Sequence, residues 1–182
     1  MEKFKTARAS RVSITELMLP SHSNFSGKIH GGYILNLMDQ IAFACASKHS
    51  QSYCVTASVN KVDFLNPIEV GELVTLKASI NYTGRTSMVV GVRVESENVT
   101  SGKKKHCNSS YFTMVAKDAE GKSSPVPGLI IQDEQGIRRF ARSKQRKQEM
   151  LSRSVKFDES KFKTEEHIDF LKQENAQVQL KK

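Results

Sequence analysis

A glycine-rich loop leads directly into an apolar segment that carries one acidic residue. The loop covers residues 21–32 and ends in His30, Gly31 and Gly32, and the acid, Asp39, follows two turns later. Backbone N–H groups in the first turn of a helix lack helical partners and bear partial positive charge, so they can polarise a carbonyl group. A nearby carboxylate can act on the attacking group. This combination predicts acyl-transfer or hydrolysis chemistry.

Asp39 is the strongest catalytic candidate in the chain. Its neighbours on a helix, Leu35, Ala42 and Phe43, are apolar, so we expect them to exclude water from the carboxylate and favour its action as a general base. The alternative is a structural acid that caps a polar group or pairs across a subunit interface. The residue types alone leave both interpretations open.

Four further residues have side chains suited to the same chemistry. Asn24 could orient a water molecule or a carbonyl, although loop asparagines commonly stabilise turns. Thr56 lies in a β-rich run and could face the site, although threonine is also a common strand former. In the turn that follows, Arg85 can hold a phosphate group and Ser87 can donate a hydrogen bond, unless the turn is an ordinary hairpin.

The spacing of apolar side chains predicts the elements that position these residues. A helix is predicted over 33–48, and because it is apolar on nearly all sides we expect it to be buried. Period-two alternation and short turns predict antiparallel strands. These strands cover residues 12–18, 53–59 with an extension to 64, 74–82, 88–94 and 105–117. The predicted class is therefore α+β, with a curled sheet around one helix.

Charge is unevenly distributed along the chain. Residues 138–182 contain thirteen basic and seven acidic side chains, so they carry +6 of the total of +9. This basicity predicts attraction to a phosphorylated ligand, nucleic acid or a membrane surface. A proline-rich segment at 125–128 marks the end of the core. We therefore divide the chain into a domain over 1–132, a charged helix over 133–152 and a polar tail over 153–182, expected to be mobile or to fold on a partner.

The cysteines and the N-terminus indicate the compartment. Cys45, Cys54 and Cys107 are odd in number and lack metal-binding spacing, so we expect buried thiols, no disulfide and no metal site. The first thirteen residues lack the apolar centre of a signal peptide, and no apolar run approaches the roughly 20 residues of a membrane span. We expect a cytoplasmic protein.

An ordered set of motifs resembles the hotdog-fold acyl-CoA thioesterases, in particular the small bacterial hexameric enzymes and the animal cytosolic acyl-CoA hydrolases. The motif residues are Asn24, Gly27, His30–Gly32, Met38–Asp39, Val62–Phe64 with Pro67, Gly84–Ser87 and Pro125–Pro127. They extend over about residues 10–145. The resemblance implies a five- or six-stranded sheet wrapped around one helix, and dimers that join their sheets edge to edge and assemble into trimers of dimers.

The resemblance also implies roles for individual residues. The implied reaction is hydrolysis of an acyl-CoA to a free acid and CoA, without a metal or redox cofactor. Asp39 would act as base or nucleophile, Asn24 would come from the neighbouring protomer, and Gly32 or Tyr33 would donate the oxyanion-hole N–H. We place Thr56 with the catalytic candidates. The CoA-contacting candidates are Gly84, Arg85, Thr86 and Ser87, together with His30 and Gly31, although His30 is better explained as a loop residue that holds backbone groups.

Further basic residues could contact CoA phosphates or simply be solvated. They are Lys103–Lys105, and Arg138, Arg139 and Arg142 on one predicted helical face.

Two other function classes stay open. One is an acyl-CoA-sensing module that binds without cleaving; the presence of both Asn24 and Asp39, and the lack of a helix-turn-helix pattern, argue against it. The other is nucleic-acid binding by the basic C-terminal region. Its few aromatic residues make a base-stacking surface doubtful.

Overall fold

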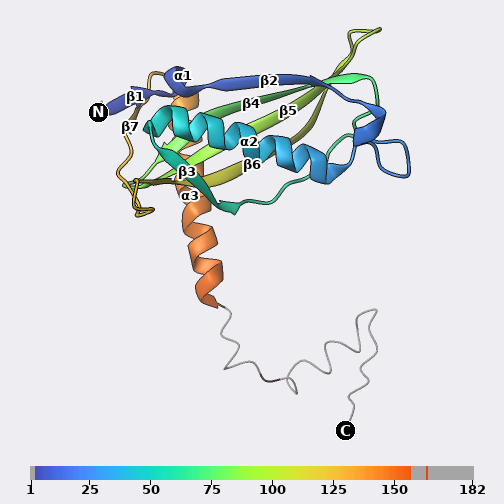
Figure 1. Cartoon of the computed structure of the whole chain (residues 1–182). Helices are drawn as coiled ribbons and strands as arrows, with labels where there is room; N and C mark the ends of the chain where they lie inside the picture. The colour runs from blue at the N-terminus through green and yellow to red at the C-terminus, as the bar shows by residue number, and fades with distance from the viewer. Residues whose placement is uncertain (1–2, 157–162, 164–182) are drawn as a thin grey trace. The chain divides into compact units, whose positions relative to one another are not determined.

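The computed structural model describes residues 3–156 and residue 163. The elements in chain order are β1 (Phe4–Thr6), α1 (Ala7–Ser10), β2 (Val12–Leu17), the 3₁₀ turn η1 (Pro20–His22), α2 (Gly31–Ser50), β3 (Tyr53–Val59), β4 (Glu72–Thr83), β5 (Ser87–Asn98), β6 (Lys104–Lys117), β7 (Gly128–Ile130) and α3 (Glu134–Lys156) (Figure 1). The chain divides into two compact units between Lys144 and Gln145, within α3. Most of the predicted tail, 153–182, lies outside the described residues.

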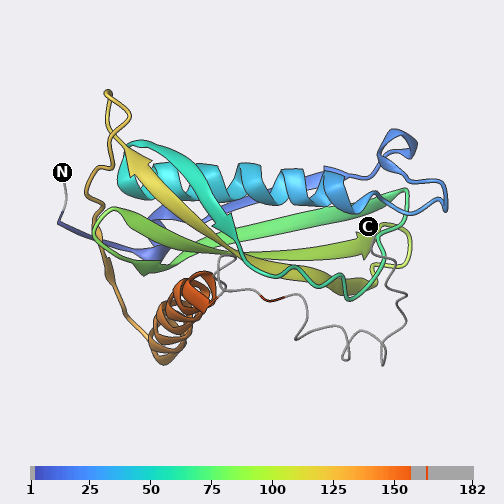
Figure 2. The same cartoon turned by 90° about the horizontal axis from the view of Figure 1, so that it is seen from below.

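Five antiparallel strands form the main sheet, in the order β2-β4-β5-β6-β3. Valines and other apolar residues alternate along β4 and β5, so one face of each strand is buried and the other carries polar side chains. Figure 2 shows α2 lying along one face of this curled sheet. The predicted hotdog arrangement of one long helix and a curled sheet is confirmed.

The sheet covers only one face of α2. The buried face contains Ile34, Leu37, Met38, Ile41, Ala42, Cys45 and Ala46. On the opposite face Asn36 and Gln40 are exposed and Phe43 keeps 38% of its surface exposed. The prediction that the helix is buried on nearly all sides is therefore wrong for the single chain, because one sheet can wrap only one face of a helix.

Two segments differ from the sequence prediction. Residues 60–67 do not continue β3 as a strand; the N–H groups of Asn60 and Leu65 instead donate to the carbonyls of Tyr111 and Cys107 on β6. The polar N-terminal segment forms β1, which pairs in parallel with β7, followed by α1. Neither short element has enough apolar residues to show a period in the sequence.

His49, near the end of α2, holds the N-terminal segment in place. Lys5 Nζ donates to the His49 carbonyl at 3.0 Å, and Ser10 Oγ lies 3.1 Å from His49 Nδ1. His49 Nε2 lies 3.2 Å from the Pro127 carbonyl. Because a carbonyl can only accept, Nε2 carries a proton, and in the neutral ring Nδ1 is then the acceptor for the Ser10 hydroxyl. Desolvation lowers the pKa of His49 and favours this neutral form.

All three cysteines are buried free thiols, as predicted. Burial raises the pKa of Cys45 to about 12, so this thiol packs as a small apolar group rather than acting as a nucleophile.

In the part of the chain that the structure describes, no helix is long and apolar enough to cross a membrane.

Candidate active site

Asp39 and Thr56 meet where α2 passes β3. Thr56 Oγ1 donates a hydrogen bond to Asp39 Oδ1 at 2.6 Å, and it also lies 3.4 Å from Met114 Sδ on β6. Asp39 is half-buried and Thr56 is exposed, on the side of α2 that the sheet leaves open. The two residues therefore form one accessible polar group at the edge strand, and a ligand can reach the carboxylate.

The first turn of α2 is capped by His30. His30 Nδ1 accepts from the Gly32 N–H at 3.1 Å, and the His30 carbonyl accepts from the Tyr33 N–H at 3.0 Å. Both predicted oxyanion donors are thus engaged with His30 in this structure. This capping contact is the backbone-holding role that the sequence favours for His30.

Gly31 lies against the ring of Phe64. A Cβ atom at position 31 would lie 3.1 Å from Phe64 Cζ, closer than nearly all such contacts. The segment between β3 and β4 therefore packs on the helix start, and a larger residue at position 31 would require the exposed Phe64 ring to shift by a few tenths of an ångström.

Asn24 stabilises its own loop. Its Oδ1 accepts from the backbone N–H groups of Ser26 at 3.0 Å and Lys28 at 3.2 Å, and from Ser26 Oγ at 2.8 Å. An ion pair between Lys28 and Glu69, at 2.6 Å, anchors the loop. Among the described residues no hydrogen bond joins Asn24 to Asp39. Within one chain, therefore, the Asn24 side chain stabilises its own turn and remains exposed to solvent.

A polar and aromatic cluster that the sequence reasoning missed supports the entry to α2. Tyr33 Oη donates to Glu16, a hydrogen bond that raises the pKa of Tyr33. The Tyr33 ring stacks on His22 with centroids 4.0 Å apart, and His22 Nδ1 accepts from the Leu19 N–H. These residues come from β2, η1 and α2. No local spacing links them, so only the fold could reveal the cluster.

The Gly84–Ser87 hairpin lies across β6 from the Asp39 site. Ser87 pairs with Val115 on β6, and Val115 pairs with Val55, the neighbour of Thr56. Two strand spacings therefore separate the hairpin from β3, about 10 Å.

Backbone hydrogen bonds fix this hairpin. Gly84 N–H donates to the Ser87 carbonyl at 2.7 Å, and the Arg85 and Thr86 carbonyls accept from Val126 and Ala116. The Arg85 side chain remains exposed and can reach a ligand.

The other basic candidates divide into paired and unpaired groups. Lys104 pairs with Glu97 at 3.2 Å and Lys105 with the buried Glu72 at 2.9 Å, which favours the structural interpretation for these two lysines.

Among Arg138, Arg139 and Arg142, only Arg139 is half-buried.

Within residues 3–156 and 163, no cluster of three or more His, Cys, Asp or Glu side chains could hold a metal ion.

The chain is similar in sequence to known proteins. A family sequence model, that of the thioesterase superfamily, matches residues 26–103. Protein VdlD of Helicobacter pylori is 41% identical over 143 residues, which cover 79% of this chain and 82% of that protein. The human cytosolic acyl coenzyme A thioester hydrolase is 33% identical over 150 residues, covering 81% of this chain and 40% of that protein.

Two solved structures extend the similarity to three dimensions. An apo-hexameric acyl-CoA thioesterase is 38% identical, with a TM-score of 0.82 and coverage of 85% of this chain and 99% of that chain. The second structure is an acyl-CoA hydrolase from Staphylococcus aureus, solved with butyryl coenzyme A, coenzyme A and coenzyme A disulfide. It is 30% identical, with a TM-score of 0.78, and the match covers 93% of this chain and 99% of that chain. Structures of that enzyme with an aspartate, an asparagine or a threonine replaced by alanine also match.

Proposed function

Because this chain belongs to the thioesterase superfamily and is an acyl-CoA hydrolase, we propose that it cleaves the thioester at Asp39, on the open face of α2. The observation that carries this proposal is the 2.6 Å hydrogen bond from Thr56 to Asp39 at an accessible position beside the edge strand. The residue types altered in the S. aureus variants (aspartate, asparagine and threonine) are those of Asp39, Asn24 and Thr56, which supports the same assignment.

In the proposed reaction Asp39 acts on a water molecule. Thr56 occupies Oδ1 of the carboxylate, so Oδ2 accepts the proton while the water oxygen attacks the thioester carbon. The carbon–sulfur bond then breaks, and the proton on Asp39 passes to the departing CoA thiolate. Direct attack by the carboxylate, followed by hydrolysis of the resulting anhydride, is the second route to the same products.

The developing oxyanion is assigned to the first turn of α2. In this structure the Gly32 N–H donates to His30 Nδ1, so a thioester carbonyl would replace the imidazole at that donor. The Gly32 N–H therefore has a hydrogen-bond acceptor both before and after the substrate binds, so the first turn of α2 remains capped.

The proposed reaction uses no separate cofactor, because CoA is part of the acyl-CoA substrate. Arg85, exposed on the hairpin across β6, is assigned to the phosphates of CoA, and Gly84, Thr86 and Ser87 to polar contacts nearby.

Asn24 is assigned to the site of a neighbouring protomer in a dimer, with trimers of dimers as the full assembly. The exposed loop of Asn24 and the hexameric state of the similar thioesterase support this arrangement. The name of the human relative supports a cytoplasmic location.

The test is release of free thiol from acyl-CoAs ranging from acetyl to palmitoyl. Asp39→Asn should lower kcat by about 10²–10⁴-fold, because the base is lost while the shape is kept. CoA binding should persist. Asp118→Asn is the matched control, since Asp118 caps the backbone of Lys122 in an exposed turn and should leave turnover unchanged.

Near-normal turnover by Asp39→Asn would remove this residue from the mechanism. Binding of CoA by the wild type without turnover of any chain length would instead favour the acyl-CoA-sensing module.

A further inference from the structure

A cavity of about 160 Å³ lies between α1, the end of β4, β7 and the first turns of α3. Its charged lining residues are Arg8, Arg11, Asp133 and Arg139. None of the residues around it belongs to α2, to β3 or to the loop over 21–30. The cavity is therefore built from elements other than those that carry Asp39, Thr56 and Asn24.

The charges around the cavity are unbalanced. Three arginines and one acidic residue, Asp133, line the cavity, which leaves a net charge of +2. Asp133 is already engaged as a helix cap, because its Oδ1 accepts from the Gly136 N–H at 2.6 Å. An anion that binds here would therefore meet an excess of positive charge, and one oxygen of the single carboxylate is already hydrogen-bonded to the backbone.

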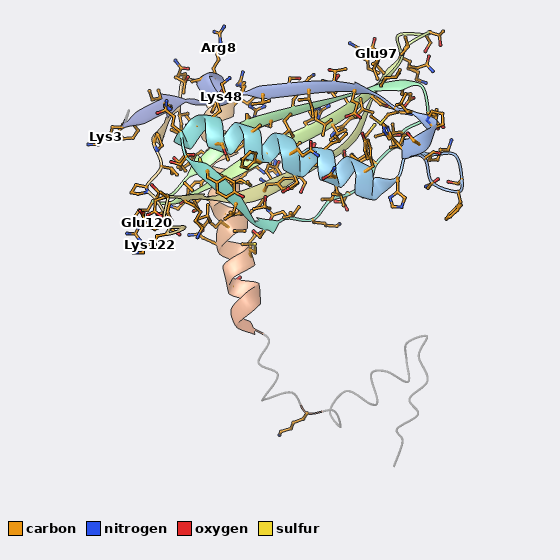
Figure 3. The ribbon with its side chains drawn as sticks, in the orientation of Figure 1. Lys3, Arg8, Lys48, Glu97, Glu120 and Lys122 are labelled. Atoms are coloured by element: carbon orange, nitrogen blue, oxygen red, sulfur yellow. The ribbon has the colours of Figure 1, made fainter. Side chains whose placement is uncertain are left out.

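The three arginines have no acidic partner in the described part of the chain. The ion pairs found there involve other cations, such as Arg93 with Glu95 at 2.8 Å. Arg139 is half-buried, whereas Arg8 is exposed and extends from α1 toward solvent (Figure 3). Guanidinium groups that line a concavity and form no ion pair with a carboxylate are suited to bidentate binding of phosphate oxygens.

The size of the cavity limits what can enter. Pockets for drug-sized ligands occupy about 300–1,000 Å³, so a cavity of about 160 Å³ accepts a small group rather than a whole nucleotide. Gly136 lines this space, and a Cβ there would lie 3.0 Å from Ile131 Cγ2 and 3.2 Å from Asp133 Oδ1. The first turn of α3 adds the partial positive charge of a helix N-terminus.

We propose that this cavity binds a phosphate or diphosphate group, with Arg139 as its central contact and Arg8 and Arg11 at its rim. The group belongs either to the nucleotide portion of CoA or to a separate phosphorylated ligand. Binding here requires no chemistry at Asp39, so the site stands independently of the proposed hydrolysis.

The test is calorimetric titration of the full chain with inorganic pyrophosphate at about 0.15 M ionic strength, where weak surface attraction is screened. The wild type should show saturable binding with one site per chain. Arg139→Gln should weaken it about tenfold through loss of charged hydrogen bonds. Arg142→Gln, exposed one turn later on α3 and absent from the lining, should change it less than about twofold.

Absence of saturable binding by the wild type would overturn the proposal. Equal weakening by Arg139→Gln and Arg142→Gln would overturn it too, because it would indicate a diffuse basic surface. Arg11→Gln provides a second variant should Arg139→Gln fail to fold, and its binding should fall in the same way.

Competition by CoA identifies the source of the phosphate group. If CoA displaces pyrophosphate and Arg139→Gln raises the KM for acyl-CoA at constant kcat, the group belongs to the substrate. If CoA leaves pyrophosphate bound and the KM is unchanged, a separate phosphorylated ligand occupies the site. Both results support the cavity as a phosphate site, and the titration remains informative even if the enzyme shows no turnover.

Discussion

At the scale of single residues, the Thr56 hydroxyl donates a hydrogen bond to one oxygen of Asp39, and in the proposed reaction this contact orients the carboxylate toward the attacking water. Its hydrogen bond occupies Oδ1 and fixes the plane of the carboxylate, while Met114 limits where the hydroxyl can turn. We therefore expect Thr56 to act as a positioning residue in the proposed reaction. Its place on a strand beside α2 makes the orientation a property of the rigid sheet and not of a loop.

We expect Thr56→Val to lower kcat by about tenfold to a hundredfold, the value of a hydrogen bond to a charged group. The KM for acyl-CoA should change little, because the substrate contacts remain. Thr56→Ser keeps the donor and should restore most of the turnover. Thiol-release kinetics on the wild type, Thr56→Val and Thr56→Ser test this prediction. Equal kcat values for Thr56→Val and the wild type would exclude the positioning role.

His30 should contribute to stability through the helix cap. Replacing it with Ala removes the acceptor for the Gly32 N–H and should lower the free energy of unfolding by about 1 kcal/mol. His30→Asn offers a new cap acceptor and should recover most of that loss. Urea unfolding measures both variants. A His30→Ala protein as stable as the wild type would show that the capping contact contributes nothing.

At the scale of elements, α2 links the site to the N-terminal segment. Its first turn is packed by Phe64 and by the Tyr33 cluster, and its last turn is tied to β1 and α1 through His49. Asp39 lies between these two anchored ends. The helix is therefore held at both ends while its middle remains open on one side.

The buried His49 predicts a specific dependence of stability on pH. Desolvation lowers its pKa in the folded state, whereas the unfolded chain has an ordinary value of about 6.5. Between these two values the unfolded chain binds more protons, so the free energy of unfolding should fall as pH decreases below about 6.5. Urea unfolding at pH 7.5 and pH 5.5 should show this loss.

His49→Gln is the control for this prediction. The variant should be less stable overall yet show a weaker fall between the two pH values. Glu95 does not interfere in this window, because hydrogen bonds from Lys77 and Arg93 lower its pKa to about 2. Identical pH dependence in the variant and the wild type would contradict the assignment to His49.

At the scale of the whole molecule, the open side of the chain has the character of an interface. β3 is an edge strand, and Tyr53 on it packs edge-on against Phe43 of α2, with ring centroids 5.7 Å apart. Both aromatic residues remain exposed in the single chain. Exposed aromatic residues beside an unpaired strand edge are suited to pairing with a second copy.

A composite site predicts complementation between inactive protomers. In a dimer of Asn24→Ala with Asp39→Asn, one of the two sites keeps both native residues. Random mixing should therefore restore about a quarter of wild-type turnover in thiol-release assays. Co-expression with two different tags allows the mixed oligomers to be purified, and each variant alone serves as the control. Mixed oligomers without recovered turnover would place the whole site within one protomer.

The sequence by itself determined the helix that carries Asp39, the main strands and the antiparallel pairing of β4, β5 and β6. These features are local: apolar spacing selects helix or strand, and short turns between strands require them to pair with neighbours. The glycine-rich approach to the helix was equally local, and with the ordered motifs it indicated the family and its chemistry.

Only the tertiary structure decided how these parts meet. It showed which face of α2 the sheet leaves open, that Thr56 donates to Asp39, and that His30 engages the Gly32 N–H. It also placed polar residues far apart in sequence around His49 and around the arginine-lined cavity. Such contacts join segments that share no period or spacing, because they depend on how the sheet curls around the helix.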